Sequence, residues 1–503
     1  MAKLGPSYQT LLGHTRLSPP SLSSWAEAGG LYPFLSSVTG DPYSRISHVS
    51  FRQRTGGESG AFFDYTARYG AIRDQEDKVT LRDTLKSGEQ NDLFHALTEK
   101  IGLTHFLDLP LITLSNGQTR RARIVKAILD RPELLLLDEP LAGLDAPSRS
   151  ALTSILQQLH LEGSPRVIIG LRKGEDVPPW ITHILEIEGG TARTKISSAS
   201  HQPSEKNSQQ DLDLPSKDLN GQLLVDLQNV NVSYGNRKVL KDINWQIRQG
   251  ERWHLQGANG CGKTTLLSLL TGDHPQSFTQ RHLLLPAFDK HSRYGLGPRK
   301  RTPTAHLRAL IGVVSPEMFD AFPRRHPGMS VWEAVTTGFD GGFVPLTRNA
   351  DAQQRRLGGV GWVDVAGDDP GLSANTSAEE TESIRSWRVQ RCWEVLEALG
   401  PAAWAPGRGE TRSFASLSFS SLSPGEQRLV LLMRALVGRP PLVLLDEVWS
   451  GMDDMMIAAA RRYLRADGGA DSRQAVVVIT HWEDEVPWTG SEVKKFKLEA
   501  PSI

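Results

Sequence analysis

The residues in this sequence whose types and spacing are best suited to chemistry lie between positions 257 and 264. They match the pattern G-x-x-x-x-G-K-[ST] at every fixed position. In such a loop, backbone N–H groups and the positive end of the following helix face the phosphates of a nucleotide. Lys263 would reach the β- and γ-phosphates, and the Thr264 hydroxyl would bind Mg²⁺. The residues predicted to contact the nucleotide here are Gly257, Ala258, Asn259, Gly260, Cys261, Gly262, Lys263, Thr264 and Thr265.

The flanking segments must present this loop at the end of a strand and the start of a helix. Residues 240–255 alternate between apolar and polar side chains, which predicts a pair of strands. Residues 265–271 have the apolar density of a helix that packs on a sheet. Strand, glycine-rich turn and helix are the context that a phosphate-binding loop requires, and a chance glycine-rich loop would lack it.

A second set of residues occurs twice in the chain. Leu114-Ser-Asn-Gly and Leu422-Ser-Pro-Gly are each followed by a helical stretch and a leucine-rich run. Ser115 and Asp138 are 23 positions apart, as are Ser423 and Asp446, and one offset of 308 relates the two copies. This repetition predicts a duplicated domain.

Each leucine-rich run ends in Asp-Glu, at Asp138-Glu139 and at Asp446-Glu447. Such runs are typical of buried central strands in a parallel sheet, whose carboxyl ends deliver acids to a ligand. Asp446 is predicted to hold Mg²⁺ through water, and Glu447 to polarise the water that attacks the γ-phosphate. The alternative is that these acids are helix N-caps.

Composition excludes several other classes of protein. The 503 residues include 39% hydrophobic and 23% charged residues, so packed cores are expected. Lys+Arg and Asp+Glu both total 57, which gives no electrostatic reason to expect nucleic acid or an anionic membrane as a partner. Two cysteines, Cys261 and Cys392, cannot form a disulfide framework and indicate a reducing compartment. No run of eighteen apolar residues occurs, so no transmembrane segment is expected.

Composition also predicts where the chain divides. Residues 196–221 are polar and read as a flexible linker between a first domain at 1–195 and a second at 222–503. The acidic, polar stretch 347–383 reads as a surface insertion in the second domain. The first 26 residues carry Lys3, Arg16, serines and no acid, which leaves a mitochondrial location as the alternative to a cytoplasmic one.

The phosphate loop, the Leu-Ser-x-Gly signatures, the Asp-Glu strand ends and the Gly-x-Asp loops together resemble the nucleotide-binding domains of ATP-binding cassette (ABC) proteins. The resemblance implies an α/β fold with two tandem P-loop NTPase domains. Each would have a mostly parallel sheet, a small antiparallel β subdomain and a helical signature subdomain. By the same resemblance, Tyr234 would stack on adenine and His481 would contact the γ-phosphate.

The first copy is incomplete. No Gly-Lys-Thr or Gly-Lys-Ser precedes its signature, through loss of the loop or a faulty gene model, and Arg172 or Lys173 stands where the histidine is expected. In the ABC family two such domains close head to tail. The resemblance therefore implies one complete Mg-ATP site, in which Ser115 and Gly117 of the first domain face the phosphate loop of the second. The opposite pairing, of Asp138 and Glu139 with Ser423 and Gly425, has nothing to grip phosphates.

Pro316 or Glu317 stands where the family has a glutamine that, in transporter subunits, contacts the metal and the membrane partner. This departure and the absence of membrane helices make the chain resemble soluble tandem ABC ATPases of the ModF/PhrA type and their fungal relatives. The implied function is ATP hydrolysis that drives a conformational change on a partner protein. The alternatives are an ATP-binding subunit of a transporter with separate membrane chains, and an ATP-gated scaffold with negligible turnover.

Overall fold

The computed structural model describes two compact units of the chain, and each is considered by itself. In the first unit the described residues are 45–50, 80–85, 92–109, 114, 116–141, 146–163, 165–171, 177–188 and 191–196. In the second unit they are 221–234, 237–258, 260–288, 294–322, 329–343, 359–363, 365, 377–405, 410–466, 468–480 and 483–499. The predicted linker and the first 44 residues therefore lie almost wholly outside the described residues.

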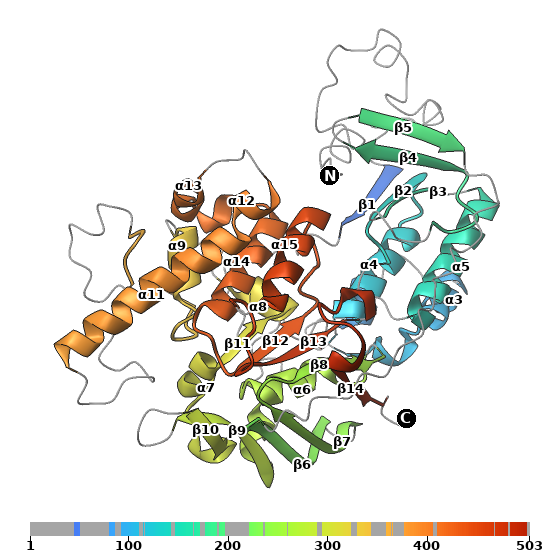
Figure 1. Ribbon diagram of the computed structural model, residues 1–503. Coiled ribbons are helices and arrows are strands. Elements are labelled where there is room, and N and C mark those ends of the chain that lie inside the picture. The colour runs from blue at the N-terminus through green and yellow to red at the C-terminus, as the bar shows by residue number, and fades with distance from the viewer. Residues whose placement is uncertain are drawn as a thin grey trace. The chain divides into compact units, whose positions relative to one another are not determined.

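The first unit has a parallel sheet of three strands in the order β1-β2-β3, which are Ile46–Ser50, Leu134–Asp138 and Arg166–Gly170 (Figure 1). All five residues of β2 are buried, as expected for a leucine-rich central strand. Leu135 and Leu137 pack into a core with the helices. The other elements are α2 (Leu81–Leu85), α3 (Asp92–Lys100), η5 (Thr104–Phe106), α4 (Asn116–Leu129), α5 (Ala146–Glu162) and the antiparallel pair β4 (His183–Glu188) and β5 (Thr191–Ile196).

The second unit contains two sheets. The antiparallel sheet has the order β10-β9-β6-β7, which are Tyr294–Pro298, His282–Phe288, Leu223–Tyr234 and Arg237–Arg248. The parallel sheet has the order β11-β12-β13-β8-β14, which are Ile311–Val314, Leu442–Asp446, Ala475–Ile479, Arg252–Gly257 and Val493–Leu498. Helix α6 (Lys263–Leu270) joins both sheets in one apolar core, which contains Trp245, Leu255 and Leu266.

Helices cover the opposite face of the parallel sheet, as Figure 1 shows. Val443 and Leu445 of β12 face this helical layer, whereas Leu442 and Leu444 face α6 and the antiparallel sheet. The helices of the unit besides α6 are α7 (Thr304–Leu310), α8 (Pro316–Ala321), α9 (Val331–Thr336), α11 (Ala378–Leu399), α12 (Pro401–Trp404), α13 (Thr411–Ser416), α14 (Pro424–Val437) and α15 (Asp454–Arg465). Short 3₁₀ turns are η7 (Pro275–Phe278), η8 (Arg299–Arg301), η9 (Phe419–Ser421), η10 (Glu483–Glu485) and η11 (Gly490–Glu492).

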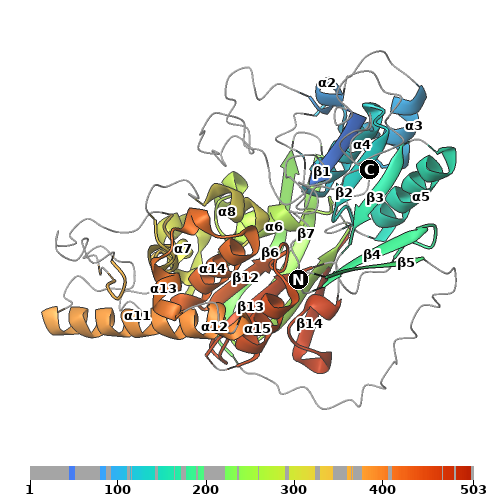
Figure 2. The same ribbon diagram turned by 90° about the horizontal axis from the view of Figure 1, so that it is seen from above.

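The predicted insertion is only partly described. Residues 378–383 are not a polar loop but the first turns of α11, whose N-terminal part extends away from the other helices in Figure 2. Ser377 and Glu380 form a reciprocal capping box that starts this helix, so its exposed first turns are stabilised without apolar packing. Residues 344–358 and 366–376 lie outside the described part of the chain.

The structure confirms the α/β fold and shows how closely the units repeat. Helices α4 and α14, strands β2 and β12, and the first residues of α5 and α15 are all related by the offset of 308 found in the sequence. The helix and strand boundaries therefore follow the repeated motifs. Within the described residues, no helix is long and apolar enough to cross a membrane.

Candidate functional site: a predicted phosphate-binding loop and an acidic strand end

The phosphate-binding loop connects β8 to α6, as the sequence predicts. Gly260 and Gly262 have φ angles of 83° and 99°, a left-handed conformation that favours glycine. A Cβ on Gly262 would lie 2.8 Å from Leu240 Cδ2. Strand β7 therefore packs directly beneath the loop, and both conformation and space require glycine at position 262.

The beginning of the loop is equally crowded. A Cβ on Gly257 would lie 2.4 Å from Cys261 Sγ and 3.0 Å from the backbone oxygen of Leu498. The Cys261 backbone N–H donates to the Ala258 carbonyl over 3.2 Å, and its side chain is buried. The loop thus curls back on itself, with the Cys261 side chain turned into the core.

Lys263 lies at the start of α6. Its Nζ donates to the backbone oxygens of Gly257 at 2.7 Å and of Ala258 at 3.1 Å, so the ammonium lies across the loop. Thr264 and Thr265 occupy the first turn of the same helix. The predicted loop residues are therefore brought together, except that Asn259 lies outside the described residues.

Asp446 and Glu447 end strand β12. Glu447 has a φ of 46°, and its backbone N–H donates to the Ile479 oxygen on neighbouring β13 over 3.1 Å. This left-handed turn ends the strand immediately after Asp446. The structure thus supports a strand end rather than a helix N-cap, because α15 begins only at Asp454, where Asp453 is the N-cap.

The charges around Asp446 explain its electrostatics. Burial raises the pKa of its carboxyl well above the usual range, and the carboxylates of Glu317 and Glu447 raise it further. Lys263 and Arg428 oppose this effect. A buried carboxyl among other acids favours binding a cation, and the oxygen donors of Thr264 and Asp446 suit Mg²⁺.

Glu317, one of the two residues at the expected glutamine position, lies close enough to Asp446 to affect its carboxyl. It lies in the first turn of α8, where Ser315 is the N-cap and Pro316 follows it. Strands β11 and β12 pair in register, with Val314 opposite Leu445, so the residues that follow each strand emerge at one edge of the sheet. This pairing brings Glu317 toward Asp446, which agrees with the metal-contacting position of the expected glutamine.

The signature segment of the second unit is a capped helix start. Ser423 Oγ accepts a hydrogen bond from the Glu426 N–H, and the Glu426 carboxylate accepts one from the Ser423 N–H at 2.7 Å. A Cβ on Gly425 would lie 2.3 Å from the Gly451 oxygen, so the loop before α15 packs against the start of α14.

In the first unit, Gly117 falls in the first turn of α4, the counterpart of α14. Ser115 lies outside the described residues. The structure therefore places the helix that carries this signature but does not describe the serine at its start.

Tyr234 ends strand β6 and is 38% exposed. Its hydroxyl lies 2.9 Å from Nε2 of His274, a buried residue that the sequence analysis missed. The two residues are 40 positions apart, so only the folded chain reveals the contact. His481, the other predicted nucleotide contact, lies outside the described residues.

The first unit repeats the acidic turn. Glu139 has a φ of 54° and its N–H donates to the Gly170 oxygen over 2.9 Å, just as Glu447 bonds to Ile479. Asp138 pairs with Gly170 as Asp446 pairs with Ile479, so the ends of β3 and β13 correspond. Both alternatives for the histidine position, Arg172 and Lys173, lie outside the described residues.

Comparison with known proteins identifies this combination of motifs. The family described as ABC transporter matches residues 51–142 and 240–450 of this chain. An uncharacterised ABC transporter ATP-binding protein of Schizosaccharomyces pombe is 32% identical over 475 residues, which cover 91% of this chain and 83% of that protein.

Two further relatives extend the similarity across most of the chain. The ABC transporter ATP-binding protein ModF of Escherichia coli is 27% identical over 90% of this chain and 84% of its own length. An uncharacterised ABC transporter ATP-binding protein of Saccharomyces cerevisiae is 27% identical over 79% of this chain and 70% of its own length. The chain is therefore a tandem-domain member of the ABC ATP-binding proteins, a family that hydrolyses ATP.

Proposed function

We propose that this ATPase binds and hydrolyses Mg-ATP at one composite site and uses the resulting closing and opening of its two domains to act on a protein partner. The site would combine the phosphate loop, Asp446, Glu447 and His481 of the second domain with Ser115 and Gly117 of the first. The observation that carries the proposal is an asymmetry. Both units have the acidic turn, but only residues 257–264 supply the phosphate-loop sequence.

The residues of the loop would perform the binding step. Backbone N–H groups of the loop and of the first turn of α6 would hold the phosphates, and Lys263 would turn its ammonium from the loop carbonyls to the β- and γ-oxygens. Thr264 and Asp446 would hold Mg²⁺, which neutralises charge on the phosphates during transfer.

Glu447 would orient and polarise the attacking water. Glu447 follows Asp446 directly, at the left-handed turn that ends β12, and one acid would serve the metal while the other serves the water. Water would form the new bond to the γ-phosphorus as the bond to the β-phosphate oxygen breaks. Ser115 and Gly117 would complete the site from the first domain in a head-to-tail arrangement.

The test compares the two acidic turns in the full-length chain. Glu447→Gln is expected to lower ATP turnover at least about 100-fold, the usual contribution of a positioned base, while retaining one ATP per chain. Glu139→Gln changes the matched residue and is expected to alter turnover less than about twofold. Turnover and bound nucleotide per chain are measured on the same preparations.

The other outcomes separate the alternatives. Equal loss in both variants would overturn the single-site proposal. Bound ATP without turnover in the parent chain would favour an ATP-gated scaffold. Ser115→Arg tests the cross-domain contribution and should also abolish hydrolysis, since the bulky cation would occupy the place of a small phosphate-binding hydroxyl. Full turnover in Ser115→Arg would contradict a composite site.

A further inference from the structure

We propose that His274 and Gln276 position Tyr234 as the platform for the nucleotide base, and thereby fix the distance between the base and the phosphate loop. This inference rests on the proposed role of Tyr234 in the ATP site. It adds two positioning residues to that site, both in the segment that follows α6.

The contact between His274 and Tyr234 has a defined direction. The Gln276 backbone N–H donates to His274 Nδ1 over 3.1 Å, so this nitrogen carries no proton. In the neutral ring the proton is therefore on Nε2, which lies 2.9 Å from the Tyr234 hydroxyl and donates to it. The rings meet edge to face at 71°, with centroids 5.8 Å apart.

Burial keeps this arrangement neutral. His274 is 1% exposed, and burial lowers its pKa to about 4, so the ring is uncharged at neutral pH. Tyr234, in contrast, is 38% exposed. One edge of the tyrosine is thus held by a buried partner while part of the side chain stays accessible for stacking against a base.

Amide side chains fix the backbone beside Tyr234 as well. Gln276 Nε2 donates to the Ser233 oxygen at 2.7 Å, and Gln276 Oε1 accepts from the Ser233 N–H at 3.3 Å. Gln280 makes the same pair of bonds to Asn231, at 2.8 and 3.2 Å. These two side chains bond to the end of β6 in the way that a neighbouring strand would.

The same segment is joined to the phosphate loop. The backbone N–H groups of Asp273 and His274 each donate to the Ser268 oxygen over 3.0 Å, at the end of α6. Helix α6 begins with Lys263 and has only eight residues. A short rigid helix therefore connects the residue that grips phosphate to the residues that hold Tyr234, which fixes the separation of the two subsites.

The experiment measures equilibrium binding of Mg-ATP and of inorganic tripolyphosphate to the full-length chain carrying Glu447→Gln, which prevents turnover. His274→Phe keeps a flat ring of similar size but removes the donor. It is expected to weaken ATP binding about fivefold, the usual effect of one lost neutral hydrogen bond, and tripolyphosphate binding less than twofold. Tyr234→Phe should give the same pattern.

A double variant makes the test independent of folding defects. If His274 acts through the Tyr234 hydroxyl, His274→Phe has no further effect in the Tyr234→Phe background. Additive losses, or equal weakening of ATP and tripolyphosphate, would overturn the inference. Lys263→Ala distinguishes failure of the underlying site, because it must weaken both ligands if the phosphate loop binds nucleotide at all.

Discussion

The two acidic turns have the same backbone conformation but different surroundings. Asp138-Glu139 and Asp446-Glu447 end equivalent strands, with φ angles of 54° and 46° at the glutamates and matched bonds to the next strand. β13 lies between β12 and β8 and is wholly buried, whereas β3 alternates between exposed and half-buried residues up to its buried last residue. The conformation of the turn therefore depends on the local sequence and the parallel pairing of the strands. What makes Asp446-Glu447 a candidate catalytic site is the set of strands around it, which includes β8 and the loop that follows it.

Helices α4 and α14 also match in position but differ in how their side chains are packed. Arg434 on α14 is 4% exposed, and its guanidinium donates to Thr337 Oγ1 at 2.8 Å and to the Gly342 oxygen at 2.6 Å. Lys126, at the matched position of α4, is exposed. The segment 337–342 that covers Arg434 thus converts one surface position into an interior one.

The largest expected effect is on nucleotide binding. Lys263→Ala removes the ammonium that lies across the loop and is expected to weaken ATP binding about 100-fold, or roughly 2.7 kcal/mol. Titration calorimetry on the full-length chain measures it. The matched control is Lys126→Ala, a lysine of the first unit that should leave affinity unchanged. Similar losses in both variants would remove the distinction between the units.

The next effect is on stability. Arg434→Ala leaves a cavity and an unpaired Gly342 oxygen, and is expected to lower the free energy of unfolding by about 2–4 kcal/mol. Lys126→Ala should change it by less than about 0.5 kcal/mol. Amide hydrogen exchange resolves the two units and measures both changes. A small effect at Arg434 would mean that the cost of burying its charge, which lowers its pKa to about 10, cancels its hydrogen bonds.

Acid should affect the second unit through His274. Its pKa is about 4 in the folded chain and 6.5 without burial, so the unfolded chain binds the proton more readily between these values. The stabilisation is fully present above pH 6.5 and is lost as pH falls toward 4, with a slope of about 1.4 kcal/mol per pH unit. Denaturation across this range should lose that slope in His274→Phe. An unchanged slope would assign the acid sensitivity to other groups.

The smallest effect concerns two ion pairs. Glu186 and Lys195 of the first unit meet at 2.9 Å with both side chains more than half exposed, so Glu186→Gln should cost less than about 0.5 kcal/mol. Glu251 of the second unit is 6% exposed and accepts from Lys494, Trp253 and the Arg248 N–H. Glu251→Gln should cost about 1–2 kcal/mol. Equal values measured by denaturant unfolding would contradict the role of burial.

The sequence predicted the parts of the fold that depend on local pattern. The β8–loop–α6 unit, the acidic strand ends and the offset of the repeat all follow from spacing along the chain. Contacts between distant segments were not predictable. His274 meets Tyr234 only because the turn after α6 packs against β6. For Glu317 the sequence left two alternatives at the expected glutamine position, and the pairing of β11 with β12 places Glu317 near Asp446.

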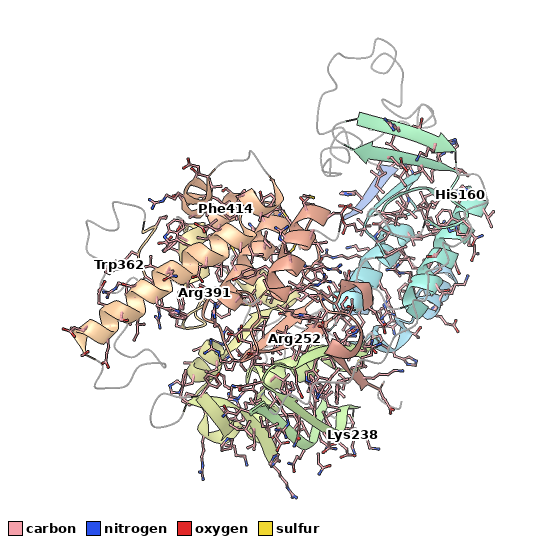
Figure 3. The ribbon with its side chains drawn as sticks, in the orientation of Figure 1. His160, Lys238, Arg252, Trp362, Arg391 and Phe414 are labelled. Atoms are coloured by element: carbon pink, nitrogen blue, oxygen red, sulfur yellow. The ribbon has the colours of Figure 1, made fainter. Side chains whose placement is uncertain are left out.

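Long-range interactions also hold charged side chains that are only partly exposed, such as the half-buried Arg252. The Arg252 guanidinium, labelled in Figure 3, donates to the Ala470 and Gln474 oxygens before β13, although arginine in a sequence normally indicates a surface. Residues 378–383 are polar, and their composition therefore predicts that they are part of a surface insertion. They begin helix α11 instead, because a capping box rather than an apolar face starts that helix. In both cases hydrogen bonds to specific backbone groups decide the local structure, and the residue composition alone predicts it wrongly.

The close approach of Gly425 to Gly451 has a mechanical consequence. A Cβ on Gly425 would lie only 2.3 Å from the Gly451 oxygen, so the start of α14 and the loop before α15 are in direct backbone contact with no space between them. A displacement of either segment must be transmitted to the other within a fraction of an ångström, because interiors this dense do not compress. The start of α14 and the loop before α15 should therefore move together as one rigid unit.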